Sequence, residues 1–150
     1  MKNQFLKTTF LVAFGAVGLY GCQQEDTTPP VISSVSVNDT LGLDFAVLPG
    51  DSLYIRFTVT DENSLSQFRA SIHDAADGHG HEGETDTVAV VPNTGLWVDT
   101  RVQSLSGTTV TKTLLYVVPD TIQGVWHWEL QAIDQSGNSA EEFIVEFDVQ

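Results

Sequence analysis

The histidines are the residues of this chain best suited to metal chemistry, because there are only four and they lie in two places. His73, His79 and His81 fall in and beside one glycine-rich stretch, and His127 lies much further along the chain. Neutral imidazole is a preferred ligand of zinc, with Zn–N bonds of about 2.0–2.1 Å. We therefore take these four histidines as candidate ligands of one divalent metal ion.

The spacing of apolar residues predicts that two of these histidines share one face of a β-sheet. Successive side chains of a strand point to opposite faces. Ile72 ends an alternating apolar run, so His73 should point out of the core, as should His127 between Trp126 and Trp128. In an immunoglobulin-like sandwich the corresponding strands are neighbours in one sheet, where facing Cβ atoms lie about 4.5–5.5 Å apart. The two imidazoles would then be close enough to bind one ion.

The segment after His73 could supply further ligands. It is longer than an ordinary hairpin loop of about two to five residues, and it carries Asp77 and Glu82 beside His79 and His81. We expect Asp77 or Glu82 to be an additional ligand or a hydrogen-bond partner of a ligating histidine. The only methionine begins the chain, so soft ligands are scarce and zinc is the first expectation, ahead of divalent copper or nickel.

Two other interpretations stay open for these residues. A loop rich in His, Gly and acidic residues is often only a solvated surface loop, and His73 and His127 could pair with Glu129 without a metal. Asp134 and Asn138 lie in a turn where they could coordinate calcium, although a single carboxylate in a turn more often forms only an Asx turn. Calcium is therefore a weaker expectation than zinc.

The N-terminus has the order of parts of a secretory signal peptide. Lys2 and Lys7 precede an apolar run over residues 10–19, and Gly21 leads to Cys22. The run is shorter than the roughly 20 residues that a membrane-spanning helix needs, which favours cleavage. Residues 19–22 resemble a bacterial lipobox, which implies a lipoprotein signal peptide over residues 1–21 and lipidation of Cys22. The alternative is a secretory peptide without lipid and one leftover thiol.

Residues 22–30 are polar and end in two prolines. We expect this segment not to pack and to act as a tether ahead of a folded domain over residues 31–150. The residues that follow Cys22 are Gln23, Gln24, Glu25 and Asp26. They resemble the acidic export signal that sends Bacteroidetes-type lipoproteins to the outer face of the outer membrane, which implies a location at the cell surface. The alternative is a solvated acidic tether.

Charge and cysteine content narrow the range of partners. Cys22 is the only cysteine, so no intramolecular disulfide can stabilise the domain. Without residues 1–21 the chain has four Lys and Arg against twenty Asp and Glu, a net charge of −16. Such a charge repels nucleic-acid phosphates and anionic headgroups. The expected partners are a divalent cation, an envelope protein or a glycan, besides the membrane reached through the lipid.

Apolar and polar residues alternate through the rest of the chain, and no stretch has sustained helical spacing. The pattern predicts strands near residues 31–37, 53–59, 68–72, 88–91, 96–102, 110–118, 126–132 and 143–147. About seven strands at this spacing predict an all-β domain, an immunoglobulin-like or fibronectin III-like sandwich.

One resemblance covers most of this domain, from about Asp26 to Val149. The runs over residues 72–81, 124–127 and 134–138 are similar to an uncharacterised lipoprotein family of Bacteroidetes, the domain of unknown function 4625. The resemblance implies a lipid-anchored immunoglobulin-like sandwich with histidines at these places and no established activity. Members of the family tend to carry additional histidines where this chain has Leu114, Leu115 and Tyr116, so a site that depends on those ligands would be weaker here.

These observations lead to two expected functions. The first is a cell-envelope lipoprotein that binds zinc through its histidines, and the alternative is a non-enzymatic adhesion or interaction module whose His-rich loop is incidental. We expect no catalysis, because the chain has no Gly-x-Ser-x-Gly elbow and no phosphate-binding glycine loop. The sheet face that carries the histidines should also be open to water.

Overall fold

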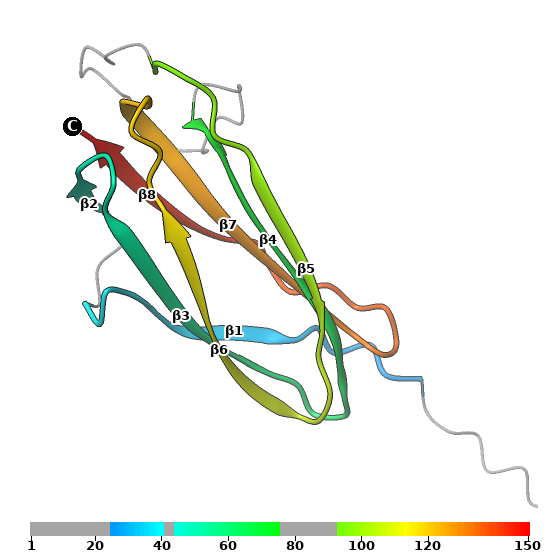
Figure 1. Ribbon diagram of the computed structural model, residues 1–150. Coiled ribbons are helices and arrows are strands. Elements are labelled where there is room, and N and C mark those ends of the chain that lie inside the picture. The colour runs from blue at the N-terminus through cyan, green and yellow to red at the C-terminus, as the bar shows by residue number, and fades with distance from the viewer. Residues whose placement is uncertain (1–24, 41–43, 76–92) are drawn as a thin grey trace, which may run out of the picture.

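The chain folds as two β-sheets packed on each other, described by a computed structural model for residues 25–40, 44–75 and 93–150 (Figure 1). These ranges contain no α-helix. Their strands are β1 (Val31–Val37), β2 (Asp44–Val47), β3 (Ser52–Thr60), β4 (Leu65–Asp74), β5 (Asp99–Ser104), β6 (Thr109–Val117), β7 (Gly124–Asp134) and β8 (Phe143–Val149). The predicted all-β sandwich is confirmed. Within the described ranges, no helix is long and apolar enough to cross a membrane.

The strands form one sheet in the order β1-β3-β6 and a second in the order β2-β8-β7-β4-β5. Neighbouring strands pair antiparallel except for β2 and β8, which are parallel. The chain passes from the first sheet to the second between β1 and β2, so its two N-terminal strands lie at edges of different sheets (Figure 1).

The core forms between the sheets because alternate residues of each strand turn inward. Burial alternates along β3, and the inward residues of β7 are likewise inaccessible to solvent. The fully buried residues of these two strands are Leu53, Ile55, Phe57, Val59, Trp126, Trp128, Leu130 and Ala132. Burying one large apolar side chain stabilises a fold by about 1.5–3 kcal/mol, so this interior replaces the disulfide that the chain cannot form.

Aromatic side chains join the two sheets at the centre of the core. The Phe57 ring lies 5.2 Å from the Phe68 ring and 5.9 Å from the Trp128 ring, between centroids. Trp128 also donates a hydrogen bond from Nε1 to the Tyr116 hydroxyl over 3.1 Å. Burial raises the pKa of Tyr116, although this hydrogen bond and the guanidinium of Arg101, 3.9 Å over the ring, act in the opposite direction.

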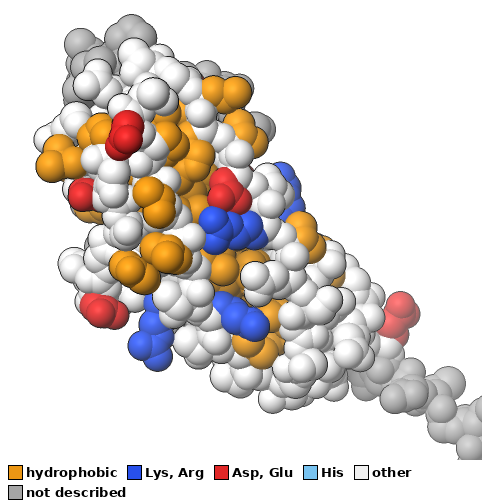
Figure 2. All heavy atoms as spheres, in the orientation of Figure 1, with side chains coloured by type: hydrophobic (Ala, Val, Ile, Leu, Met, Phe, Trp, Pro, Cys, Tyr) orange, Lys and Arg blue, Asp and Glu red, His pale blue; other side chains and the backbone are white. Residues whose placement is uncertain are grey.

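Arg101 closes the side of the sandwich between β5 and β6. Its Nη1 donates to the main-chain oxygen of Leu115 over 2.8 Å, and its Nη2 lies 2.8 Å from Asp99 Oδ2. Apolar side chains remain exposed around it, and Figure 2 shows them spread over the face on which β6 lies. The exposed apolar residues of β3, β5 and β6 are Tyr54, Val102, Leu115 and Val117.

The strand predictions differ from the structure at β2 and at β5. The short β2 was not predicted. β5 begins at Asp99 rather than at Leu96, because Leu96 and Val98 are 80% and 65% exposed and only Trp97 between them is buried. The strand predicted over residues 88–91 lies outside the described residues.

The segment before β1 packs against the domain, contrary to our expectation for a tether. Asn138 donates from Nδ2 to the main-chain oxygen of Asp26 over 3.0 Å, and Pro30 is buried. The main-chain oxygen of Asp26 thus finds a donor in the turn after β7, and the proline brings no N–H group that burial would leave without an acceptor. Ordered contacts with the domain therefore begin at Asp26.

Candidate metal centre

The register of β4 and β7 places His73 directly opposite His127. The residues that precede and follow them, Ile72 and Trp128, point into the core, so both histidines lie on the outer face of the sheet. Their ring centroids are 5.7 Å apart and the ring planes are nearly perpendicular, at 86°. This confirms the prediction that these strands are neighbours and that the two imidazoles share one face.

His73 has an oxygen atom beside each of its ring nitrogens. Nε2 lies 2.7 Å from Glu129 Oε1, and Nδ1 lies 3.0 Å from the main-chain oxygen of Asp74. A neutral imidazole carries a single N–H, so it can donate to only one of these two acceptors. Donation to both oxygens would require a second proton on the ring.

His127 lies beside a second carboxylate. Its Nε2 is 3.1 Å from Glu146 Oε2, and the register of β7 and β8 pairs the two residues directly. The side chain of Glu146 is 48% exposed, whereas that of His127 is only 3% exposed. The cluster therefore extends from the buried side chain of His127 to an open carboxylate at the surface.

Three side chains of this cluster could hold one ion. His73, His127 and Glu129 each offer a ligand atom, and these atoms all lie within 4.8 Å of one another. Donors around a tetrahedral zinc ion with bonds of about 2.0–2.1 Å stand roughly 3.3 Å apart. The longest separation would have to shorten by up to about 1.5 Å, which side-chain rotation can supply while the paired strands stay in place.

Burial of this face differs from the expectation. The whole of His127 is 2% exposed, and the side chains of His73 and Glu129 are 18% and 14% exposed. The prediction that this sheet face is open to water was therefore wrong for the part that carries the histidines. Low solvent access strengthens the attraction between a carboxylate and any cation that binds here.

Neighbouring polar groups hold the cluster. Ser71 Oγ lies 3.5 Å from Glu129 Oε2, on the outer side of β4. Asn93 accepts a hydrogen bond from the Val125 N–H over 2.7 Å and donates from Nδ2 to the Val125 carbonyl over 2.5 Å. The same Nδ2 donates to the Asp74 carboxylate. The Asn93 side chain thus links two strand ends: the end of β4, which carries His73, and the start of β7, which carries His127.

Of the residues predicted as ligands, the structure brings together His73 and His127. Four others, His79, His81, Asp77 and Glu82, lie outside the described residues, as does Cys22.

The cluster also contains two carboxylates, Glu129 and Glu146, that the sequence did not predict as ligands. We had expected Glu129 only as a partner in a metal-free pair, and Glu146 was missed. Glu129 could have been found as a ligand, because it lies two residues after His127 and so on the same face of the strand. Glu146 could be found only from the register of β8.

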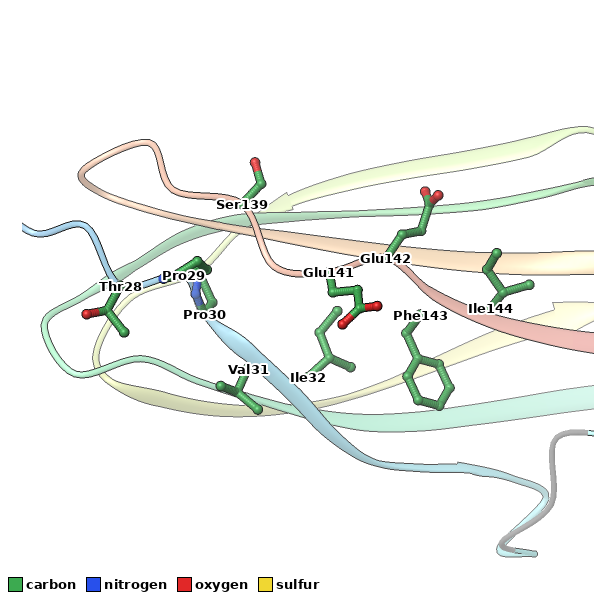
Figure 3. A pocket seen from close by; sticks show the side chains of 10 residues that line it. All are labelled: Thr28, Pro29, Pro30, Val31, Ile32, Ser139, Glu141, Glu142, Phe143 and Ile144. Atoms are coloured by element: carbon green, nitrogen blue, oxygen red, sulfur yellow. The ribbon is translucent and has the colours of Figure 1, made fainter. Parts of the chain in front are cut away.

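A groove at the other end of the sandwich is separate from this cluster. It has a volume of about 710 Å³ and lies between the start of β1 and the segment that leads into β8. Figure 3 shows Thr28, Pro29 and Pro30 on one side of it and Glu141 on the other. None of its described lining residues is a histidine.

Comparison with known proteins identifies the chain by family alone. The family model described as Domain of unknown function (DUF4625) matches residues 20–146. No curated protein matches the chain. The match covers most of the chain, including both histidine strands, and the chain therefore belongs to the DUF4625 family.

Proposed function

We propose that this protein binds one divalent metal ion, zinc before divalent copper or nickel, through His73, His127 and Glu129. The observation that carries the proposal is that ligand atoms of these three residues, two imidazole nitrogens and a carboxylate oxygen, all lie within 4.8 Å of one another. His73 Nε2 is already 2.7 Å from Glu129 Oε1, so an ion bound at this point would contact both residues.

The ligand types favour zinc. Two imidazoles and one carboxylate are a ligand set that zinc accepts. Glu146 beside His127 could rotate in as a fourth ligand or hydrogen-bond the ring and raise its basicity. His79, His81, Asp77 and Glu82 stay predictions from the sequence. The chain leaves the cluster at Ala75 and returns at Asn93, and these four residues belong to the intervening segment.

We further propose that the protein works at the outer membrane as a lipoprotein of the immunoglobulin-like class. The N-terminal signal pattern, Cys22 and the acidic residues after it support the location. The strand order supports the class, because β4 and β7 are neighbours in the sheet that faces β1, β3 and β6. We propose binding without catalysis, for metal acquisition, buffering or structural use.

Calorimetric titration of the full chain with zinc, in detergent micelles, tests the metal site. We expect one ion with a submicromolar Kd, and a loss of affinity of at least about 100-fold when His73 and His127 are both changed to alanine. Arg69→Ala is the matched control, because Arg69 is an exposed residue of the same strand. Binding that survives in the double histidine variant would refute the site.

Exposed apolar side chains favour a second candidate function, a module that binds an envelope protein. Tyr54 and Leu115 are paired in register on β3 and β6 and are 51% and 45% exposed, and Val117 is 59% exposed. Grouped apolar exposure of this kind often marks a protein-binding surface. A photocrosslinker at position 115, used in intact outer membranes, should join the domain to one protein if this function is correct. Crosslinks to lipid alone would count against it.

A further inference from the structure

Three aspartates converge at the end of the sandwich remote from the histidines. Asp134 ends β7, Asp61 follows β3 directly and Asp26 precedes β1. The register pairs Leu65 with Asp134, which brings the turn between β3 and β4 against the end of β7. Each of the three carboxylates offers one oxygen, and these oxygens lie within 4.8 Å of one another.

One oxygen of Asp26 and one of Asp61 are already bound to backbone N–H groups. Asp61 Oδ1 accepts from Asn63 over 2.9 Å and from Ser64 over 2.8 Å, and Asp26 Oδ1 accepts from Thr28 over 3.0 Å. The other oxygen of each residue, Oδ2, is buried and accepts no hydrogen bond from any described residue. Two carboxylate oxygens are therefore shielded from water without a donor, which is unfavourable unless a cation binds them.

Asp134 adds a third negative charge to this cluster. It is 2% exposed, and its carboxylate accepts from the Asn138 N–H over 2.8 Å and from Asn138 Nδ2 over 2.7 Å. Burial raises its pKa, but the bonds from Asn138 and from the N–H groups of Gly137 and Ser136 lower it further than burial raises it. The side chain is therefore ionised at neutral pH.

No Lys or Arg of the described ranges forms an ion pair with these three carboxylates. Among the described residues, the ion pair that involves a Lys or Arg joins Arg101 to Asp99, on another part of the sandwich. Three carboxylates thus meet with two of their oxygens buried and without a partner. Buried carboxylates without a counter-charge either take up a proton or coordinate a cation.

We propose that Asp26, Asp61 and Asp134 bind one Ca²⁺ ion, which fixes the N-terminal segment to the domain. An all-oxygen ligand set suits a hard cation. Opposite ligands of calcium, at about 2.3–2.6 Å from the ion, stand up to about 5 Å apart, and the three carboxylate oxygens lie within that span. Magnesium usually keeps several of its waters and is held by only one or two carboxylates. Three carboxylates that meet at one point thus favour calcium.

This site differs from the weak calcium expectation drawn from the sequence, which paired Asp134 with Asn138. The Asn138 amide is a donor here, to Asp134 Oδ2 and to the main-chain oxygen of Asp26, and so it positions two ligands. The two remaining ligands come from Asp26 and Asp61. The proposal does not depend on the zinc site, because the two clusters share no residue.

Calcium at this point would also hold one wall of the groove shown in Figure 3. Thr28, Pro29 and Pro30 line the groove and begin two residues after Asp26. An ion bound to Asp26 joins this segment to the turns that contain Asp61 and Asp134. Calcium would therefore limit the motion of residues 26–30 and keep the groove in one shape.

Titration of the EDTA-treated full chain with calcium chloride, in detergent micelles, tests this site. Calorimetry should show one bound ion, and the melting temperature should rise with calcium. Asp61→Asn should weaken binding at least tenfold, whereas Glu62→Gln, at the exposed neighbouring position, should bind as the wild type does. Without calcium, the Asp61→Asn variant should be at least as stable as the wild type, because it removes the repulsion between Asp61 and the other two carboxylates and keeps the oxygen that accepts from Asn63 and Ser64.

A second control separates this site from the zinc site. The variant with both His73 and His127 changed to alanine should bind calcium normally.

Hydrogen exchange gives a second measurement for the same proposal. Calcium should slow exchange of the amides of Thr27, Thr28, Val31 and Ile32 in the wild type and have no such effect in an Asp26→Asn variant. The proposal is overturned if calcium leaves the melting temperature and the exchange of the wild type unchanged. An equal calcium response in the Asp61→Asn and Glu62→Gln variants would also overturn it.

Discussion

Replacing Asn93 with alanine should weaken both the fold and the metal site, because this one amide joins the end of β4 to the start of β7. Its oxygen accepts from the Val125 N–H over 2.7 Å, and its nitrogen donates to the Val125 carbonyl over 2.5 Å and to the Asp74 carboxylate. Val125 and Asp74 lie within two residues of His127 and His73 along their strands. Loss of the amide therefore removes hydrogen bonds that hold the backbone near both His73 and His127.

The size of the effect follows from the number and kind of these bonds. Each bond to a backbone group contributes about 0.5–1.5 kcal/mol, and a bond to a charged group contributes about 1.5–3 kcal/mol. The groups are only partly buried, so water can replace some of the lost partners. We therefore expect the Asn93→Ala variant to lose about 2–4 kcal/mol of unfolding free energy, and its zinc affinity to fall about tenfold because its support is removed.

Urea unfolding and zinc calorimetry of the Asn93→Ala variant check this reasoning. Gln103→Ala is the matched control, because Gln103 is an exposed amide on β5 and its loss should cost less than about 0.5 kcal/mol. Asn93→Asp keeps an acceptor for the Val125 N–H but places a second carboxylate against Asp74, so it should be at least as unstable as the alanine variant. An alanine variant within about 0.5 kcal/mol of the wild type would refute the role of this amide.

Three further predictions concern the core and one turn. Burial raises the pKa of Tyr116 above 10.0 despite the indole hydrogen bond and the nearby guanidinium, so the neutral phenol stabilises the fold up to about pH 10 and this stability is lost as pH rises through the folded-state pKa. In a Tyr54→Phe variant without residues 1–21, near-ultraviolet absorbance should show Tyr116 ionising only above its ordinary pKa, and an ordinary titration in the folded protein would contradict this. Phe57→Ala removes a ring that packs on two other aromatic rings, and urea unfolding should show a loss of about 3–5 kcal/mol. Gly124→Ala should destabilise more than Gly137→Ala, because both glycines have positive φ, at 98° and 91°, but only at Gly124 would a Cβ collide with a neighbouring side chain; equal melting temperatures would argue against the collision.

The faces of β4 and β7 could be predicted from the sequence because local alternation decides them. Trp126 and Trp128 alternate with His127, and their burial in the core places the histidine on the outer face. The meeting of His73 with His127 required one further assumption, that the two strands are neighbours, as they are in immunoglobulin-like sandwiches. The registers in the structure agree with it.

Features that depend on distant pairing could not be predicted in this way. β2 has only four residues, and its strand structure depends on parallel pairing with β8 at the far end of the chain. Glu146 meets His127 only through the register of β7 and β8. The packing of Asp26 depends on an amide donor at Asn138, far away in the sequence. None of these contacts leaves a local signal in the sequence.

The parallel pairing of β2 with β8 has a mechanical consequence. β2 follows the N-terminal strand, and β8 ends at Val149, next to the C-terminal residue. When force acts between the start of β2 and the end of β8, these parallel strands are sheared along each other, so their hydrogen bonds share the load instead of breaking one at a time. Once β1 has detached from β3, a pull between the two ends of the domain would therefore be resisted by shear between β2 and β8.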